Sequence, residues 1–181
     1  MKEYFSQETS PVTQRKCGIL VADDEPEIRD VLSFGLQQEG FSVWLAADGQ
    51  EALDLYRGHC ETIDVVLLDV RMPRLDGPAT LAALQELTPQ IPCCFMSGYL
   101  GHYTEAGLRH FGARAVLKKP FRLPEVAQVL RELAGSAASN PYHAATQRRA
   151  FDKQRRGGEN EFYLDRLSCE KKFRFMYERR S

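Results

Sequence analysis

The chain has 181 residues, 43% of them hydrophobic and 27% charged, and a net charge of −1 at pH 7. These values predict one globular domain with tails, and they exclude a membrane-embedded chain because no apolar run approaches the roughly 18 residues of a membrane span. The charge is uneven: residues 141–181 contain 11 of the 24 Lys and Arg but only 6 of the 25 Asp and Glu. An acidic body and a basic tail are expected to have different roles.

The first sixteen residues are polar, contain Pro11 and lack the apolar stretch of a secretory signal, so we predict a flexible segment over 1–16. The five cysteines show no Cys-x-x-Cys spacing, which favours reduced thiols. Both observations predict a cytoplasmic protein. No membrane partner is expected.

Strand-like and helix-like patterns then alternate along the chain. Short apolar runs predict buried strands over residues 18–22, 41–46, 65–69, 91–96 and 113–117. Helical spacing of apolar residues, or helical composition, predicts helices over residues 26–39, 50–56, 79–87, 103–111 and 124–134. Five such units predict an α/β fold, a doubly wound five-stranded parallel sheet with helices on both faces. Residues 136–181 have the composition of a linker followed by a basic tail, disordered or partly helical.

Polar residues stand at the ends of four of the predicted strands. Asp23 and Asp24 follow the first, Asp69 ends the third, Ser97 follows the fourth and Lys119 follows the fifth. Because parallel strands end at one edge of a sheet, these side chains are expected to converge. Each alone has an ordinary interpretation as a helix cap or a solvated turn residue. Their occurrence together favours a functional site.

The chemistry open to such a group of side chains is narrow. Three neighbouring carboxylates repel one another and favour a hard divalent cation, which predicts bound Mg2+. A carboxylate beside Mg2+ can attack a phosphoryl group and form an aspartyl phosphate, which would make Asp69 the acceptor. Lys119 and the Ser97 hydroxyl could then neutralise and bind the phosphoryl oxygens.

With these residues in place, the segment 17–135 resembles the receiver domains of response regulators, the two-component signalling family that includes chemotaxis regulators. The resemblance is carried by Asp23-Asp24-Glu25, by Asp-Val-Arg-Met-Pro-Arg-Leu-Asp-Gly over 69–77, by Ser97-Gly98 and by Lys119-Pro120-Phe121. It implies the flavodoxin-like strand order 2-1-3-4-5. It also implies Asp69 as phosphoacceptor, Asp24 and Asp69 as direct Mg2+ ligands, Asp23 acting through water, and the backbone carbonyl of Arg71 as a further ligand.

The same resemblance implies how the protein works. Lys119 and Ser97 would bind the phosphoryl group, which would come from a phosphohistidine on a histidine kinase or phosphotransfer protein. The domain would not be an enzyme beyond self-catalysed phosphoryl transfer and slow autodephosphorylation. It would control a downstream partner protein, and a phosphorylation-dependent dimer is a further expectation.

The sequence departs from the family where an aromatic residue usually lies, three positions before the lysine. Val116 occupies this place and has no ring to rotate inward, so Tyr99 or Phe111 is a candidate substitute. Arg71 and Tyr99 are expected at the rim of the phosphate site, where they would slow dephosphorylation.

Two alternatives remain to be weighed. A phosphatase of the haloacid-dehalogenase type needs a second acid two residues after its nucleophilic aspartate, where this chain has Arg71. The basic stretch over residues 148–156 could contact DNA or RNA, although the tail is short and shows no helix-turn-helix pattern. Control of a partner protein is therefore favoured over nucleic-acid binding.

Overall fold

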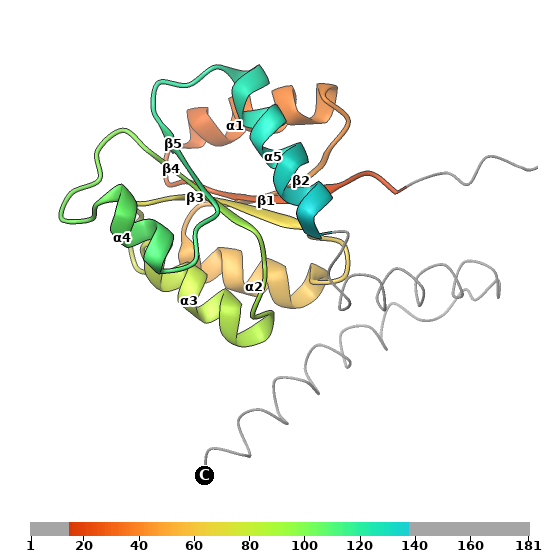
Figure 1. The fold of residues 1–181 in the computed structure, drawn as a ribbon. Coiled ribbons are helices and arrows are strands. Elements are labelled where there is room, and N and C mark those ends of the chain that lie inside the picture. Colours follow the sequence, from red (N-terminus) through yellow and green to blue (C-terminus); the bar gives the residue numbers. More distant parts are fainter. Residues whose placement is uncertain (1–14, 138–181) are drawn as a thin grey trace, which may run out of the picture.

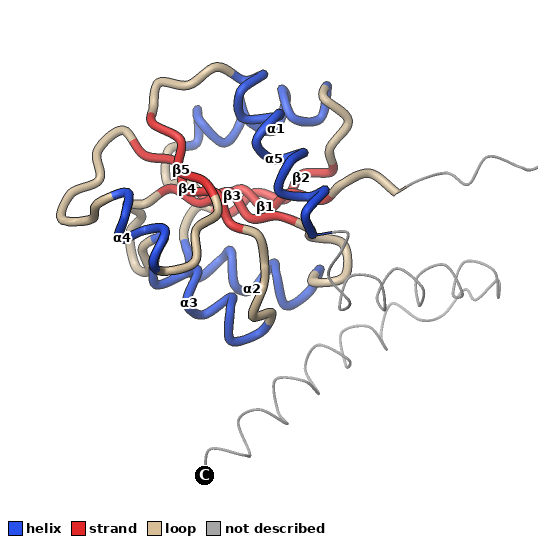
Figure 2. Tube along the Cα trace, viewed as in Figure 1, coloured by secondary structure: helices blue, strands red, loops and turns tan. Residues whose placement is uncertain are grey.

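The computed structural model describes residues 15–137. Strands and helices alternate from end to end (Figures 1 and 2). The strands are β1 (Gly18–Ala22), β2 (Ser42–Ala46), β3 (Val65–Asp69), β4 (Cys93–Ser97) and β5 (Ala115–Lys118). The helices are α1 (Pro26–Gln38), α2 (Gly49–His59), α3 (Gly77–Leu87), α4 (Glu105–His110) and α5 (Leu123–Ala137).

The strands form one parallel sheet in the order β2-β1-β3-β4-β5. Helices α1 and α5 cover one face and α2, α3 and α4 the other (Figure 1). This arrangement confirms the predicted doubly wound α/β fold and its strand order.

The two faces of the sheet build two separate hydrophobic cores. Alternate residues of each strand point to opposite faces, so the neighbours Cys93 and Cys94 contribute to different cores, as alternation requires. Strand β3 is buried along its whole length because helices cover both of its faces. A buried central strand holds the residue at its carboxyl end, Asp69, in a fixed position.

Some predicted boundaries were wrong. Strand β4 begins at Cys93 rather than at residue 91, and Pro92, which has no N–H, contributes only a carbonyl to Val66. Helix α5 continues through Gly135, where a helix end was expected, because this glycine lies in open space and nothing nearby forces the chain to turn.

Near the N-terminal end of the described residues, the Arg15 guanidinium group bonds both carboxylate oxygens of Asp64 at 2.8 Å. Asp64 also accepts a hydrogen bond from the Gly18 amide at 2.7 Å. Residues 1–14 and 138–181, with the remainder of the predicted flexible segment and almost all of the basic tail, lie outside the described residues.

None of the helices within residues 15–137 combines the length and the hydropathy that a membrane span requires. The thiols of Cys17, Cys93 and Cys94 are free, as expected. Cys60 is disulfide-bonded, so the expectation of reduced cysteines is wrong at that residue.

Candidate phosphoryl-transfer site

The candidate site lies at the carboxyl edge of the central strands. Strand β3 ends at Asp69, which pairs in register with Met96 of β4, and Ser97 pairs with Lys118 of β5. Asp23 follows β1 directly, and its amide donates to Ala46 of β2. The sheet therefore gathers residues that are up to 96 positions apart in sequence.

Lys119 joins two of the predicted acids. Its Nζ lies 2.8 Å from Asp69 Oδ1 and 2.7 Å from Asp23 Oδ2, with Glu25 further away at 3.6 Å. The Asp23 side chain is fully buried, Asp69 is 6% exposed and the Lys119 side chain 15%. One ammonium group thus faces two buried carboxylates, which leaves the site with an excess of negative charge.

The remaining carboxylate oxygens accept backbone amides. Asp69 Oδ2 accepts the Arg71 N–H at 2.6 Å, and Asp23 Oδ1 accepts the Glu25 N–H at 2.9 Å. These bonds orient both carboxylates, because a carboxylate held by an amide on one oxygen and an ammonium on the other has little freedom to rotate.

Burial and the neighbouring charges shift the pKa values of Asp69 and Lys119 in opposite directions. Burial raises the pKa of Asp69 above its usual value, although the bonds from Lys119 and the Arg71 amide oppose this effect. For Lys119, burial lowers the pKa, but the hydrogen bonds and charges of Asp23 and Asp69 outweigh burial and raise it overall. The lysine is therefore held firmly in its charged form.

Ser97 is buried beside this group but does not bond to it. Its hydroxyl donates to the Tyr99 carbonyl at 2.8 Å and accepts the Tyr99 N–H at 3.1 Å. Among the hydrogen bonds within residues 15–137, none joins Ser97 to Asp69. A role for Ser97 in phosphoryl binding therefore requires its hydroxyl to turn away from Tyr99.

Of the predicted metal ligands, Asp23 and Asp69 are bridged by Lys119, and Asp24, the residue after Asp23, is exposed. The described residues contain no cluster of three or more His, Cys, Asp or Glu arranged to hold a metal. Two buried carboxylates with excess negative charge nevertheless fit Mg2+, which binds through one or two carboxylates and keeps waters in its remaining positions. The Arg71 carbonyl as a further ligand stays a prediction.

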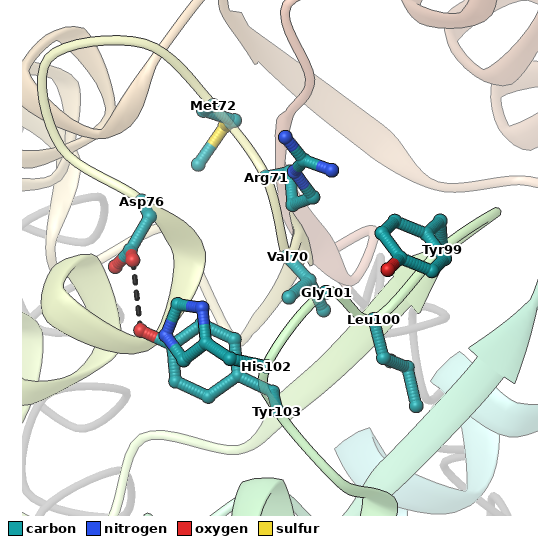
Figure 3. Close-up of a pocket in the computed structure, with 9 residues that line it drawn as sticks. All are labelled: Val70, Arg71, Met72, Asp76, Tyr99, Leu100, Gly101, His102 and Tyr103. Atoms are coloured by element: carbon teal, nitrogen blue, oxygen red, sulfur yellow. Dashed lines mark hydrogen bonds between the residues drawn. The ribbon is translucent and has the colours of Figure 1, made fainter.

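Arg71 and Tyr99, the two residues expected at the rim of the phosphate site, each bond a residue of the candidate site: the Arg71 amide donates to Asp69, and the Tyr99 backbone bonds Ser97. The guanidinium carbon of Arg71 lies 5.6 Å from the centre of the Tyr99 ring, and Tyr99 is 69% exposed. Both residues line a pocket of about 400 Å³ between the loops that follow β3 and β4 (Figure 3). The rim is thus built from a stacked cation and ring.

Sequence reasoning missed two contacts that fix the loop between β3 and α3. The Tyr103 hydroxyl donates to Asp76 Oδ2 at 2.8 Å, and Arg74 forms an ion pair with the buried carboxylate of Asp48. Asp76, just before Gly77-Pro78, and Asp48, just before Gly49, carry an N-cap signal that could have been recognised. Their partners could not, because no local pattern brings them together.

Comparison with known proteins decides the family. The family model described as "Response regulator receiver domain" matches residues 19–131, well over half of the chain. The chain belongs to the response regulator receiver domain family. The receiver domain is the signalling domain of two-component response regulators.

Curated relatives agree with this assignment. The receiver domain is 37% identical over 115 residues to the response regulator MprA of Mycolicibacterium vanbaalenii, covering 64% of this chain and 49% of that protein. It is 36% identical over 115 residues to the transcriptional regulatory protein CpxR of Escherichia coli K12, covering 64% and 48%. It also matches the sensor kinase CckA of Brucella abortus at 34% identity over 115 residues, covering 64% of this chain and 12% of that protein. The chain thus spans about half the length of the two regulators and far less of the kinase.

Solved structures show the same fold. A response regulator receiver domain protein from Clostridium thermocellum has a TM-score of 0.61 at 29% identity, covering 66% of this chain and 95% of that one. The CheX–CheY–BeF3–Mg2+ complex from Borrelia burgdorferi has a TM-score of 0.62 at 28% identity, covering 66% and 90%. The matched region therefore spans most of each matched chain.

Proposed function

We propose that Asp69 accepts a phosphoryl group from a phosphohistidine on a histidine kinase or phosphotransfer protein, and that the modified domain then controls a partner protein. The observation that carries this proposal is the contact of Lys119 with Asp69 and Asp23 at the carboxyl edge of the sheet. A carboxylate fixed beside an ammonium group is arranged to attack a phosphorus atom, and the ammonium offsets the negative charge of the incoming phosphoryl group.

In the proposed reaction, an oxygen of Asp69 forms a bond to phosphorus while the bond between phosphorus and the partner's imidazole nitrogen breaks. The imidazole leaves with that electron pair and takes a proton from solvent. Asp69 needs no general base because an ionised carboxylate has no proton to lose. Lys119 supplies positive charge to the phosphoryl oxygens, and the Ser97 hydroxyl donates to one of them after leaving Tyr99.

Mg2+ is the cofactor that we propose for this site. When bound, it would neutralise the phosphoryl oxygens and the excess carboxylate charge. Asp69 and Asp24 would hold it directly and Asp23 through water. The CheY from Borrelia burgdorferi, a structural relative, was solved with BeF3 and Mg2+, which supports the proposal.

The domain proposal divides the chain into segments 1–16, 17–135 and 136–181, with all phosphoryl chemistry in the middle one. Self-catalysed phosphorylation and slow autodephosphorylation are the only reactions proposed. A partner protein as downstream target, a phosphorylation-dependent dimer and a cytoplasmic location stay predictions. Binding of nucleic acid by the basic tail remains the second candidate and depends on residues outside the described part of the chain.

The test is incubation with Mg2+ and a small acyl phosphate. We expect a base-sensitive adduct on the wild type, its loss in Asp69→Ala and on removal of Mg2+, and its retention in the control Asp54→Asn, where an exposed carboxylate is removed. Absence of an adduct on the wild-type protein, or its persistence in Asp69→Ala, would contradict the proposal.

A further inference from the structure

The pocket beside the phosphoryl-transfer site is lined by two loops that start at key residues of that site. The loop after β3 begins next to Asp69, and the loop after β4 begins next to Ser97. Figure 3 shows Arg71 and Tyr99 on one side of the pocket and Asp76 and Tyr103 on the other. Any movement of either loop would change the shape of this space.

On the far side of the pocket, a hydrogen bond joins two of the residues that line it. The Tyr103 hydroxyl donates to Asp76 Oδ2 at 2.8 Å, while Asp76 Oδ1 accepts the Ala79 N–H at 2.9 Å and so caps helix α3. The bond to this carboxylate raises the pKa of Tyr103. Through Asp76, the end of the β4–α4 loop is tied to the first turn of α3.

The start of the same loop is held by Ser97. The hydroxyl of Ser97 both donates to and accepts from the backbone of Tyr99. A serine has only one hydroxyl proton, so Ser97 cannot donate to a phosphoryl oxygen without releasing the Tyr99 carbonyl. Phosphoryl binding at Ser97 would therefore free the loop at its first anchor and leave Tyr103 as the second.

Two features of the β4–α4 loop would allow it to move once Ser97 releases it. Gly101 adopts φ +64°, a conformation open to glycine at little cost, and the adjoining pocket of about 400 Å³ gives the loop space to enter. The Tyr103 ring packs against the core cluster that also contacts Val116, and it meets Phe111 edge-on at 6.3 Å. A shift of Tyr103 would therefore reach the end of α4 directly.

We propose that Tyr103 is the positioning residue that couples Ser97 to helix α4, and that its hydrogen bond to Asp76 holds the unphosphorylated conformation and breaks when Asp69 is phosphorylated. This inference rests on the proposed function. It places the aromatic side chain of the switch at the start of α4, whereas Val116 on β5 has neither a ring nor a hydroxyl. Tyr99, one of the substitutes suggested by the sequence, is exposed and touches the rim instead.

The test uses beryllofluoride with Mg2+ as a stable analogue of the phosphoryl group. If the bond exists only in the unphosphorylated state, Tyr103→Phe destabilises that state relative to the switched one. The variant should then bind the analogue about tenfold more tightly, the effect expected of one hydrogen bond to a charged group. Asp76→Asn keeps an oxygen for the α3 cap and should act in the same direction. Tyr56→Phe is the matched control, because its hydroxyl makes a bond of equal length, 2.8 Å, to Thr88 away from the site.

A second measurement separates switching from loss of stability. The amide NMR signals of residues 98–111 in free Tyr103→Phe should move along the line from free to analogue-bound wild type, as a shifted two-state equilibrium requires. Unchanged or weaker analogue binding by Tyr103→Phe, or the same change in Tyr56→Phe, would overturn the inference while the proposed function stands. Failure of the wild type to bind the analogue would overturn both.

Discussion

The ammonium group of Lys119 lies 2.8 Å from Oδ1 of Asp69, and this contact joins the last strand of the sheet to its central one. The same ammonium also bonds Asp23. A lysine shared by two buried carboxylates reduces their repulsion in the free domain and stands beside the proposed acceptor.

We expect Lys119→Met to lower the free energy of unfolding by about 2 kcal/mol at pH 7, because it leaves two buried carboxylates without their counter-charge. The raised pKa of Lys119 means that its stabilisation is present below pH 10.5 and is lost as the pH rises through the raised value. Urea unfolding at pH 7, 9 and 11 should therefore show the difference shrinking only at the highest pH. Lys118→Met, an exposed neighbour, should change stability by less than about 0.5 kcal/mol.

Asp69→Asn should stabilise the domain at neutral pH. Because burial raises the pKa of Asp69, its contribution to stability is fully present below 3.8 and is lost as the pH rises through the raised pKa. The free energy of unfolding of the variant should therefore rise relative to wild type as the pH increases from 3.8 towards neutrality, by roughly 1 kcal/mol, a typical size for one substitution. Thermal unfolding across this range measures the gain, and a constant difference at all pH values would contradict it. Asp54→Asn, with an exposed side chain, serves as the control.

Asp24→Asn should weaken Mg2+ binding by about tenfold, since fewer charged oxygens mean lower affinity for a hard cation. Because Asp24 is exposed, the same variant should keep its stability without metal within about 0.5 kcal/mol. Calorimetric titration with Mg2+ measures the affinity. An Mg2+ affinity equal to that of the wild type would show that Asp24 is not a ligand. Asp30→Asn, on an exposed face of α1, is the matched control.

The loop after Asp69 is anchored by Asp48. The buried Asp48 carboxylate caps α2 through the Gln50 and Glu51 amides and pairs with Arg74, a residue with φ +64°. Asp48→Ala should lower the free energy of unfolding by about 2 kcal/mol, since it removes the cap and the partner of Arg74 together. Arg74→Ala should lower it by less than about 1 kcal/mol because the arginine is largely exposed.

Arg74→Gly refines this prediction. Glycine adopts positive φ freely, so Arg74→Gly should be more stable than Arg74→Ala although both lose the ion pair. Chemical unfolding of Asp48→Ala, Arg74→Ala and Arg74→Gly measures the free energy of unfolding of each variant. An Arg74→Ala variant as stable as Arg74→Gly would show that the backbone conformation at this position is not strained.

Helix α1 approaches α5 through Gly35. A Cβ added there would lie 2.0 Å from Leu123 Cδ2, so Gly35→Ala should lower the free energy of unfolding by about 1–3 kcal/mol through overpacking. Gly58→Ala is the matched control within α2, where an added Cβ meets nothing within 4 Å. It should stabilise the protein by about 0.4–1 kcal/mol because alanine has less freedom in the unfolded chain. Equal effects at both sites would contradict the proposed close contact.

The sequence by itself determined the alternation of strands and helices, since buried parallel strands are apolar throughout and amphipathic helices repeat every three to four residues. It also indicated Asp23, Asp69 and Lys119, because parallel strands end at one edge whatever their spacing in the chain. The predicted boundaries at residue 91 and Gly135 were wrong, because a residue that disfavours a helix or strand is tolerated where its surroundings leave room.

Only the tertiary structure decided which of these groups touch. It placed Lys119 between two carboxylates, turned Ser97 toward Tyr99 and left Asp24 exposed, outcomes that depend on side-chain rotation rather than on sequence spacing. The bond from Tyr103 to Asp76 spans 27 positions and joins two loops, where no periodicity constrains the partner. Contacts between loops arise from the packing of the elements that carry them, and local patterns in a sequence do not encode that packing.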